Sequence, residues 1–525
     1  MIAAELREQV ERWIADEVDP GSAEELSDLL SRDAADELAD RFSHPLTFGT
    51  AGLRGPLRAG PNGMNRAVVR RAAAGIAAWL PPGGRVVIGY DGRHGSYDFA
   101  HDSAGVFAAA GFEALLLPRL LPTPLLAFAV RRLGASLGVM VTASHNPPQD
   151  NGYKVYLGDG AQIIAPVDAE IESSIAAVGP TRAIPLAGTY TTLDDAIVED
   201  YVGAVSSLIG PGPRELRIVH TAMHGVGAAV ARQVLAEAGF ADVIEVAQQA
   251  EPDPDFPTVA FPNPEEPGAL DLAFALAAER DADLIIANDP DADRCAAAVA
   301  ADGRWRMLRG DEVGDLLADS LLRKGVNGTY ATTIVSSTML SAMAARHGMP
   351  FAETLTGFKW ISRAAPDLVF GYEEALGYAV APDLVKDKDG ISAALLLAEL
   401  AASLKAGGSS LSQRLEELAA EYGRHATDQL SFRVEDLSII SGAMARLRAD
   451  PPTSLLAAAV TVSDRLPEAD VITLSFAGGR VVVRPSGTEP KLKAYLEVVL
   501  DGSADEARRR LAQLRAETSA ALGLG

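Results

Sequence analysis

The sequence predicts an α/β protein in which three related mixed α/β domains are followed by a smaller α+β domain. A strand–helix–strand order recurs three times along the chain, which is typical of α/β domains with mostly parallel strands. The last stretch has a different order, with several strands ahead of one long helix. The length of 525 residues is that of about three or four domains, and 48% apolar residues suffice for several cores.

A helical extension is expected ahead of the first domain. Residues 1–18 interleave glutamates with large apolar residues, which is the pattern of an amphipathic acidic helix and not of a signal peptide. Ser22 and Glu25 have the spacing of a capping box that opens a second helix towards Phe42.

The repeat is read from apolar strand-like runs, helix-like runs and Gly-Phe or Gly-Met stops. The expected strand, helix and strand of each repeat are 85–90, 103–110 and 114–117; then 216–220, 226–238 and 243–246; then 330–335, 338–346 and 351–355. In the last part of the chain the expected strands are 471–476, 480–483 and 494–500, before a helix over 503–522. The polar stretch 405–450 reads as mostly helical.

These elements divide the chain into five parts. They are a helical extension over 1–42, domain I over 43–208, domain II over 209–318, domain III over 319–425 and domain IV over 426–525.

Composition excludes several classes of partner. The net charge of −25 disfavours nucleic acid, whose phosphates need a basic face, although a few focused cations can still attract a small anion. Cys295 is the single cysteine, so no intrachain disulfide can form. The sequence contains no uninterrupted run of about eighteen apolar residues, so no membrane span is predicted. We therefore expect a cytoplasmic protein without a membrane or nucleic-acid partner, and leave monomer and dimer open.

A strand followed by a rigid polar turn gives one serine a special place. Residues 137–141 form an apolar run typical of a buried strand, and 146–148 (NPP) prevent a helix directly after it. Ser144 is therefore expected at the carboxyl end of a strand, where open α/β sheets bind ligands. Beside His145 it is a candidate nucleophile. The alternative is a turn serine that bonds only local backbone.

A second apolar strand ends in three aspartates at alternate positions. Residues 283–287 (DLIIA) lead into Asp289, Asp291 and Asp293, and carboxylates so spaced can converge on one hard divalent cation. Arg294 partly offsets their charge. A solvated acidic loop is the alternative, but such loops seldom follow directly on a fully apolar strand.

Two further loops carry groups suited to a phosphorylated sugar. The strand-like run 367–372 ends at Glu373 and Glu374, and ionised carboxylates accept hydrogen bonds from sugar hydroxyls. Adjacent glutamates are also common on plain surfaces. Residues 484–491 (RPSGTEPK) combine a guanidinium, two hydroxyls and a glycine, a composition that favours phosphate over an ordinary turn.

Two other stretches contain glycine and a cation. Residues 48–55 (FGTAGLRG) form a second glycine-rich loop, and 356–359 (TGFK) offer a lysine for acid–base chemistry. A surface lysine in a turn is an equally good interpretation of the latter.

Taken together, these stretches resemble the α-D-phosphohexomutase family of phosphoglucomutases and phosphomannomutases. The motifs TASHNP, DPDADR, E-E-x-x-G and RPSGTEPK occur in the family's order, and the resemblance runs from about residue 48 to residue 500. It implies four domains around one central cleft, each contributing a loop.

The resemblance also implies roles for single residues. Ser144 would be phosphorylated in the resting enzyme and would hold Mg²⁺ together with Asp289, Asp291 and Asp293. Glu373 would bind sugar hydroxyls. The phosphate that does not react would lie against Arg484, Ser486, Gly487, Thr488 and Lys491, with Thr50 also in contact with substrate. The cations of the cleft would be Arg54, His145, Lys154, Arg294 and Lys359, with Lys359 a candidate base.

The implied activity is the interconversion of sugar 1-phosphate and sugar 6-phosphate, with glucose or mannose as the sugar. It would run through the phosphoserine and a bisphosphorylated sugar, with glucose 1,6-bisphosphate as activator. Ala375 stands where many members have a serine, which removes one hydrogen bond to the sugar. The sequence EEALG resembles a subgroup with phosphopentomutase and glucose-1,6-bisphosphate synthase activities. A catalytically silent phospho-sugar sensor is the alternative outside the enzymes, but it would need neither Ser144 nor the aspartates.

Overall fold

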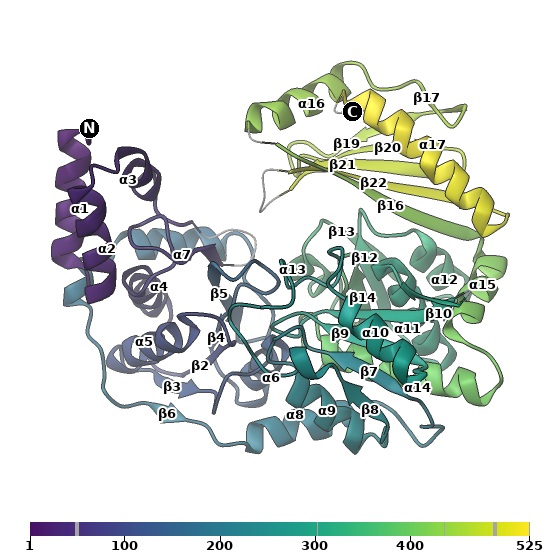
Figure 1. The fold of residues 1–525 in the computed structure, drawn as a ribbon, viewed down its shortest axis with the longest axis horizontal. Coiled ribbons are helices and arrows are strands. Elements are labelled where there is room, and N and C mark those ends of the chain that lie inside the picture. Colours follow the sequence, from purple (N-terminus) through teal and green to yellow (C-terminus); the bar gives the residue numbers. More distant parts are fainter. Residues whose placement is uncertain (48–51, 302, 435, 487–490, 524–525) are drawn as a thin grey trace. The chain divides into compact units, whose positions relative to one another are not determined.

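The computed structural model describes the whole chain except residues 48–51, 302, 435, 487–490 and 524–525. The chain forms two compact units (Figure 1). Unit one contains residues 1–307 and 378–402, and unit two contains residues 308–377 and 403–525.

Unit one begins with three helices that share a small apolar core of their own. They are α1 (Ala4–Asp16), α2 (Pro20–Ser31) and α3 (Ala35–Arg41). The predicted capping box at Ser22 is wrong, because the side chain of Asp19 accepts a hydrogen bond from the Ser22 amide and caps α2. The single helix expected towards Phe42 is also wrong. It breaks at Asp33, which has the left-handed φ of 53°.

The first sheet of unit one has the strand order β1-β5-β4-β2-β3-β6. Its strands are β1 (Leu53–Pro56), β2 (Arg85–Tyr90), β3 (Glu113–Leu116), β4 (Leu137–Val141), β5 (Asp150–Leu157) and β6 (Thr191–Thr192). The helices of this stretch are α4 (Arg66–Trp79), α5 (Ser96–Ala109), α6 (Thr123–Arg132), α7 (Val167–Ala176), the 3₁₀ turn Thr181–Ala183 and α8 (Ala196–Ser206). Strand β5 runs antiparallel to β4, so the sheet is mixed.

The second sheet of unit one has the order β11-β10-β9-β7-β8. Its strands are β7 (Ile218–Thr221), β8 (Val243–Glu245), β9 (Leu284–Asn288), β10 (Cys295–Ala301) and β11 (Arg304–Met307). The helical segments of this stretch are α9 (Ala228–Glu237), the 3₁₀ turn Ala247–Gln249 and α10 (Asp271–Arg280). The later helix α14 (Gly390–Ala406) begins under the β9–β10 loop, where the Gly390 amide donates to the Ala292 carbonyl.

The strands that follow in the chain form a sheet of order β13-β12-β14-β15. Strands β12, β13 and β14 belong to unit two, and the boundary between the units falls within β15, after Gly377. These strands are β12 (Thr329–Thr333), β13 (Phe351–Thr354), β14 (Leu368–Glu373) and β15 (Gly377–Ala379). The helices of this part are α11 (Gly310–Arg323), α12 (Met339–His347), α13 (Phe358–Ile361) and α15 (Leu411–Tyr422).

The three sheets share one topology, which confirms the predicted repeat. In each sheet, the first strand of the repeat lies between the second strand of the repeat and the strand that follows next in the pattern, which we call the third strand. It is parallel to both, giving the orders β3-β2-β4, β8-β7-β9 and β13-β12-β14. The loops that follow β4, β9 and β14 therefore leave their sheets at equivalent positions. Ser144 and the aspartates lie on the first two of these loops, and Glu373 is the strand residue that directly precedes the third.

The end of the chain forms an antiparallel sheet of order β16-β22-β21-β20-β19 in unit two. Its strands are β16 (Arg424–Arg433), β19 (Thr461–Asp464), β20 (Ile472–Phe476), β21 (Gly479–Pro485) and β22 (Lys491–Leu500), with a small pair β17 (Ser454–Leu455) and β18 (Ala458–Ala459). Helices α16 (Leu437–Ala449) and α17 (Ala504–Leu522) cover one face of this sheet (Figure 1). The predicted α/β domains followed by an α+β domain are thus confirmed.

The expectation for residues 405–450 is confirmed for most of the stretch, which is covered by the end of α14, by α15 and by α16, but it missed one strand. Helix α15 ends before Gly423, and a ten-residue strand, β16, follows. Every residue of β16 pairs with β22. This long-range pairing overrides the weak local preference of a polar stretch.

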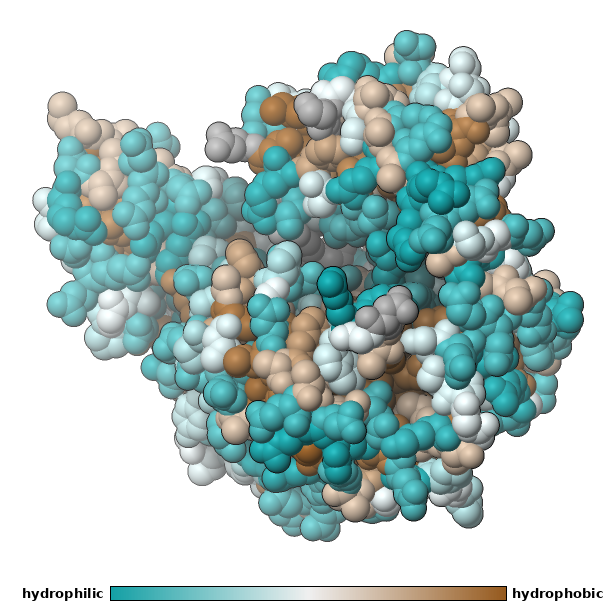
Figure 2. Space-filling model, turned by 45° about the vertical axis from the view of Figure 1, so that its right-hand side comes forward, coloured by the Kyte–Doolittle hydropathy of each residue, from teal (hydrophilic) through white to brown (hydrophobic). Residues whose placement is uncertain are grey.

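The surface shown in Figure 2 is mostly hydrophilic, with apolar residues in small scattered groups. Within the described part of the chain, no single helix has the length and hydropathy of a membrane span; only α14 and α15 taken together, bent by 91°, meet those criteria.

Candidate active site

Ser144 lies on the loop after β4 and is 3% exposed. Its backbone has the left-handed φ of 54°, and its amide donates to the Thr142 hydroxyl. The Ser144 Oγ donates to Asp289 Oδ2 at 2.9 Å and lies 3.1 Å from His145 Nδ1. The loop after β4 of the first sheet thus contacts the aspartate loop of the second sheet, as a reactive serine beside a metal site would require.

A single guanidinium holds the backbone of this loop. Arg93 Nη2 donates to the carbonyls of Ser144 and Asn146 at 2.6 and 2.5 Å. Its Nη1 donates to the carbonyls of Pro147 and Asp150 at 2.8 and 3.1 Å. Arg93 is 4% exposed, and four hydrogen bonds from a buried planar cation fix the loop that carries the serine.

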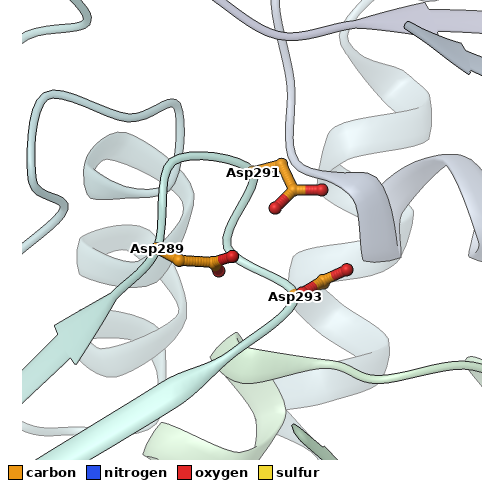
Figure 3. A group of neighbouring side chains, drawn as sticks. All are labelled: Asp289, Asp291 and Asp293. Atoms are coloured by element: carbon orange, nitrogen blue, oxygen red, sulfur yellow. The ribbon is translucent and has the colours of Figure 1, made fainter. Parts of the chain in front are cut away.

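The three predicted aspartates all lie on the β9–β10 loop, and their carboxylates approach one another (Figure 3). Asp289, Asp291 and Asp293 are at most 1% exposed, and one carboxylate oxygen of each lies within 4.8 Å of the others. Among the described residues, Asp291 Oδ1 and Asp293 Oδ1 have no hydrogen-bond partner although they are buried. Burial and the two neighbouring carboxylates raise the pKa of Asp289 well above its ordinary value. Hard oxygen donors, unpaired atoms and mutual repulsion all fit a divalent cation.

Two predicted cations lie beside these carboxylates. Lys154 Nζ is 2.7 Å from Asp291 Oδ2 and 2.9 Å from Asp293 Oδ2. Arg294 Nε is 3.9 Å from oxygens of Asp289 and Asp293. Both side chains therefore moderate the negative charge of the cluster, as expected for a site that handles phosphate.

His145 and Arg54 complete the predicted residues of unit one. Burial and the charges of Arg294 and Arg54 lower the pKa of His145 well below its ordinary value, so its imidazole is neutral near pH 7. Arg54 Nη1 donates to Asn146 Oδ1 at 3.2 Å, on the serine loop. Thr50 lies outside the described residues.

In unit two, the adjacent glutamates after β14 differ in their surroundings. Glu374 Oε2 accepts hydrogen bonds from the hydroxyls of Thr333 and Ser336 at 3.2 and 3.1 Å. Glu373 is the last residue of the strand and is partly exposed. Glu374 therefore joins its loop to the segment after β12, and Glu373 stays the predicted contact for the substrate.

The remaining predicted residues also belong to unit two. Lys359, on α13, is 9% exposed, and its Nζ lies 5.7 Å from the ring centre of Trp360. Arg484 is near the end of β21, and the Ser486 amide donates to the Lys491 carbonyl at 2.8 Å across the start of the predicted phosphate loop. Gly487 and Thr488 of that loop lie outside the described residues.

Sequence reasoning missed three residues of the site. Besides Arg93, Lys388 Nζ lies 3.2 Å from Asp293 Oδ2, and Thr123 Oγ1 donates to Asp291 Oδ2 at 2.6 Å. Burial alone would raise the pKa of Asp293, but Lys154, Lys388 and Arg294 lower it below its ordinary value. The motif KDKDG around Lys388 was a usable signal, since it places four charged residues directly ahead of a mostly apolar helix.

Comparison with known proteins places this geometry in a family. Four family models described as phosphoglucomutase/phosphomannomutase match in order: alpha/beta/alpha domain I at residues 45–181, domain II at 199–303, domain III at 309–422 and the C-terminal domain at 432–516. A probable phosphomannomutase of Haemophilus influenzae is 46% identical over 83% of this chain and 93% of its own length. The chain belongs to the phosphoglucomutase/phosphomannomutase family.

Other members are similar over nearly the whole chain. The phosphopentomutase of Mus musculus is 35% identical over 94% of this chain and 90% of its own. The structure of a putative phosphomannomutase from Thermus thermophilus has a TM-score of 0.73 and 28% identity, covering 90% of this chain and 99% of that one. Membership makes the chain a phospho-sugar mutase, an isomerase, which confirms the activity class predicted from sequence. The roles of single residues and the domain boundaries stay predictions.

Proposed function

We propose that this mutase interconverts the 1-phosphate and 6-phosphate of glucose or mannose through a phosphoserine at Ser144 and a sugar bisphosphate. The observation that supports it best is the hydrogen bond from Ser144 Oγ to Asp289 Oδ2, between residues 145 positions apart. A serine that only stabilised its own turn would not need a partner in another sheet.

The three aspartates would hold Mg²⁺ together with an oxygen on Ser144. The ion would neutralise charge on the phosphoryl group during transfer. Unpaired oxygens on Asp291 and Asp293 are free to act as ligands, and Lys154 and Arg294 keep the cluster near charge balance.

The residues of unit one prepare Ser144 for transfer. Arg93 fixes the loop, so the Oγ stays beside the carboxylates without needing to reorganise at the moment of reaction. The neutral His145 ring can donate through Nδ1 to Ser144 Oγ, while the Ser144 proton points to Asp289. Positioning of this kind is the main contribution a protein makes to phosphoryl transfer.

Transfer to the sugar begins when a sugar hydroxyl attacks the phosphorus on Ser144. The bond between phosphorus and Oγ breaks, and the hydroxyl proton passes to a base, for which Lys359 is our candidate. Glu373 would orient the sugar, and Arg484 and Ser486 would hold the phosphate that does not react. After the bisphosphate turns over, its second phosphate returns a phosphoryl group to Ser144, and glucose 1,6-bisphosphate would restore enzyme that has lost its phosphate.

Mass spectrometry of the purified protein tests this proposal. We expect a phosphate on the peptide that contains Ser144, lost when glucose 1-phosphate is added and regained with glucose 1,6-bisphosphate. Glucose 6-phosphate should form in the same mixture. A chain that binds sugar phosphates but neither carries nor transfers phosphate would be a sensor, and the proposal would fail.

A pentose substrate is the second candidate. Residues 373–377 (EEALG) form what we call the sugar loop, and Ala375 removes a hydroxyl from it. A phosphopentomutase is among the relatives that match over most of the chain. A panel of glucose 1-phosphate, mannose 1-phosphate and ribose 1-phosphate, with bisphosphate supplied, separates the two. A kcat/KM at least about tenfold higher for ribose 1-phosphate would establish the pentose activity. The same panel, with the sugar bisphosphate replaced by another phosphoryl donor and with sugar bisphosphate measured as the product, tests for bisphosphate synthase activity.

A further inference from the structure

One turn of unit two contacts both the sugar loop and the sheet that carries the phosphate loop. This turn, residues 336–338, follows β12. On one side, Ser336 Oγ donates to Glu374 Oε2 at 3.1 Å. On the other side, the Ser336 carbonyl accepts a hydrogen bond from Arg480 Nη2 on β21.

Glu497 on β22 closes the second contact. Its Oε1 accepts from the Ser337 hydroxyl at 3.1 Å and from the Thr338 amide and hydroxyl at 2.7 and 3.0 Å. Its Oε2 accepts from Arg480 Nε at 3.0 Å. His425 Nδ1 is 3.1 Å from Oε1. Glu497 is 4% exposed, so these are buried, charge-assisted bonds. We call this set of contacts the Glu497 clasp.

The register of the sheet relates the clasp to the phosphate loop. Arg480 pairs with Glu497, Val482 with Tyr495, and Arg484 with Lys493. Because side chains alternate along a strand, these three pairs share one face of the sheet. The clasp therefore lies on the face from which Arg484 projects, four residues away along the same strand.

Apolar packing supports the clasp. Val482 and Tyr495, the pair between the clasp and Arg484, form a buried cluster with Ile334 and Val335, which directly precede the turn. A rigid strand and a rigid turn are thus joined by an apolar contact and by a polar one.

We propose that Glu497 is a positioning residue that sets the spacing between the sugar loop and Arg484, the first residue of the predicted phosphate loop. Through Ser336 it ties Glu374 to Arg480, and thereby Glu373 to Arg484. The spacing decides which sugar phosphates can be held at both ends, so the clasp determines the length of sugar phosphate that binds best. The inference rests on the proposed function of the two loops.

The test compares two variants of the whole chain, one at Glu497 and one at Arg480. Glu497→Gln removes the charge and weakens the clasp, and Arg480→Lys removes the bond to Ser336 more mildly in case the first variant folds poorly. Glu517→Gln is the matched control, because Glu517 also accepts a backbone amide bond, from Leu456, in the same sheet domain without touching the turn.

The first measurement is the distance between spin labels on Ala345→Cys and Ala512→Cys, on the exposed surfaces of α12 and α17. Cys295 is buried, which protects it from the label. We expect one narrow distance distribution in the parent and in Glu517→Gln, and a broadened or shifted one in Glu497→Gln and Arg480→Lys.

The second measurement is the ratio of the dissociation constants of glucose 1-phosphate and ribose 1-phosphate, by calorimetry. We expect a change of about tenfold in Glu497→Gln and none in Glu517→Gln, since lost preorganisation weakens the better-fitting ligand most. An unchanged distance distribution, or a changed distribution with an unchanged ratio, would overturn the inference. Failure of the proposed function would show differently, as binding without isomerisation in the parent chain.

Discussion

The hydroxyl of Ser144 has one proton and two close neighbours. It can donate to Asp289 while His145 donates to it, an arrangement that needs a proton on Nδ1 of His145. Burial and the nearby arginines keep the His145 ring neutral by lowering its pKa. At the scale of single residues, the site is therefore arranged around the orientation of one oxygen.

Ser144→Ala should abolish mutase turnover while leaving sugar-phosphate binding largely intact. The substitution deletes only the atom that carries the phosphoryl group, and the sugar and phosphate loops belong to other segments. Turnover assays and calorimetry check both halves, with Ser173→Ala on an exposed helix face as control. Normal isomerisation by the alanine variant would remove the serine from the mechanism.

Asp291→Asn should reduce activity by about a thousandfold and weaken metal binding. The amide removes one negative ligand from the cluster, so Mg²⁺ added in excess should rescue activity poorly. Metal titration of the protein measures this. Asp281→Asn, at an exposed helix end, keeps a similar backbone conformation and serves as control. An unchanged metal dependence would refute the assignment of the aspartates.

Sequence alone indicated Ser144, the aspartates and Arg294, because each lies in a motif with a chemical rationale, whereas Lys154 was implied only by the family resemblance. Arg93 could not be found that way, since all four of its bonds to the serine loop go to backbone carbonyls, which carry no sequence signature. Lys388 reaches the site from a segment 95 positions after Asp293, which only the tertiary fold reveals.

At the scale of elements, the loop after the first strand of each repeat supports the loop after its third strand. Arg93, after β2, holds the Ser144 loop. After β7, the Val226 amide donates to Pro290 on the metal loop, and a Cβ on Gly225 would lie 2.3 Å from Pro290. After β12, Ser336 holds Glu374. One topology thus supplies the same kind of support three times, with different chemistry.

Arg93→Lys should lower kcat about ten- to a hundredfold with little change in KM. Lysine keeps the charge but cannot donate to four carbonyls in a planar fork. The rate of single-turnover transfer from phosphorylated Ser144 is the measurement. Arg119→Lys, which alters only an exposed ion pair with Asp195, is the control. Equal transfer rates in the two variants would show that the loop needs no such support.

Asp311, in the first turn of α11, should make stability depend on pH. Burial raises its pKa from 3.8 to about 7, so between those values the folded chain keeps a proton that the unfolded chain releases. This contribution is complete below about pH 4 and is lost as the pH rises to about 7, by at most about 4 kcal/mol. Asp311→Asn keeps an oxygen for the Ser337 amide and should flatten the fall of Tm between pH 4.5 and 7.5.

In the Asp311→Asn variant, the fall of Tm with rising pH should become smaller without vanishing, because burial also raises the pKa of Asp315. Parallel curves of Tm against pH for the parent and the variant would contradict the assignment.

The elements themselves were predictable where a single strong pattern governs them. Strand β2 has the predicted bounds, and α17 starts one residue from its predicted start. Strand β16 was not predicted, because its pairing partner, β22, lies about 70 positions later in the chain. The break between α2 and α3 depends on the left-handed Asp33, and the local sequence resembles a continuous helix.

At the scale of the whole molecule, the chain passes between the two units three times, after residues 307, 377 and 402. Unit one is completed by residues 378–402, which return from unit two. They include Lys388 and the first residues of α14, nearly all of which are buried. The second passage directly follows the sugar loop, and the segment beyond it contacts the metal loop through Gly390.

Residues 1–307 expressed alone should therefore aggregate or melt well below the full chain. Loss of residues 378–402 uncovers apolar surface and removes the hydrogen bond to Ala292. Joining 378–402 to the fragment with a Gly/Ser linker should restore a soluble, cooperatively melting protein. Calorimetry and size-exclusion chromatography compare the two, and equal behaviour would show that unit one does not depend on the returning segment.

The backbone at Ser144 restricts which nucleophile this position can evolve. Threonine has an equivalent hydroxyl, but its branched Cβ is strongly disfavoured at a φ of 54°, where a small unbranched side chain is tolerated. A methyl group would therefore be rejected for its shape before its chemistry mattered. Natural variation here should be confined to serine in working enzymes, and to glycine, asparagine or aspartate in descendants that have lost catalysis.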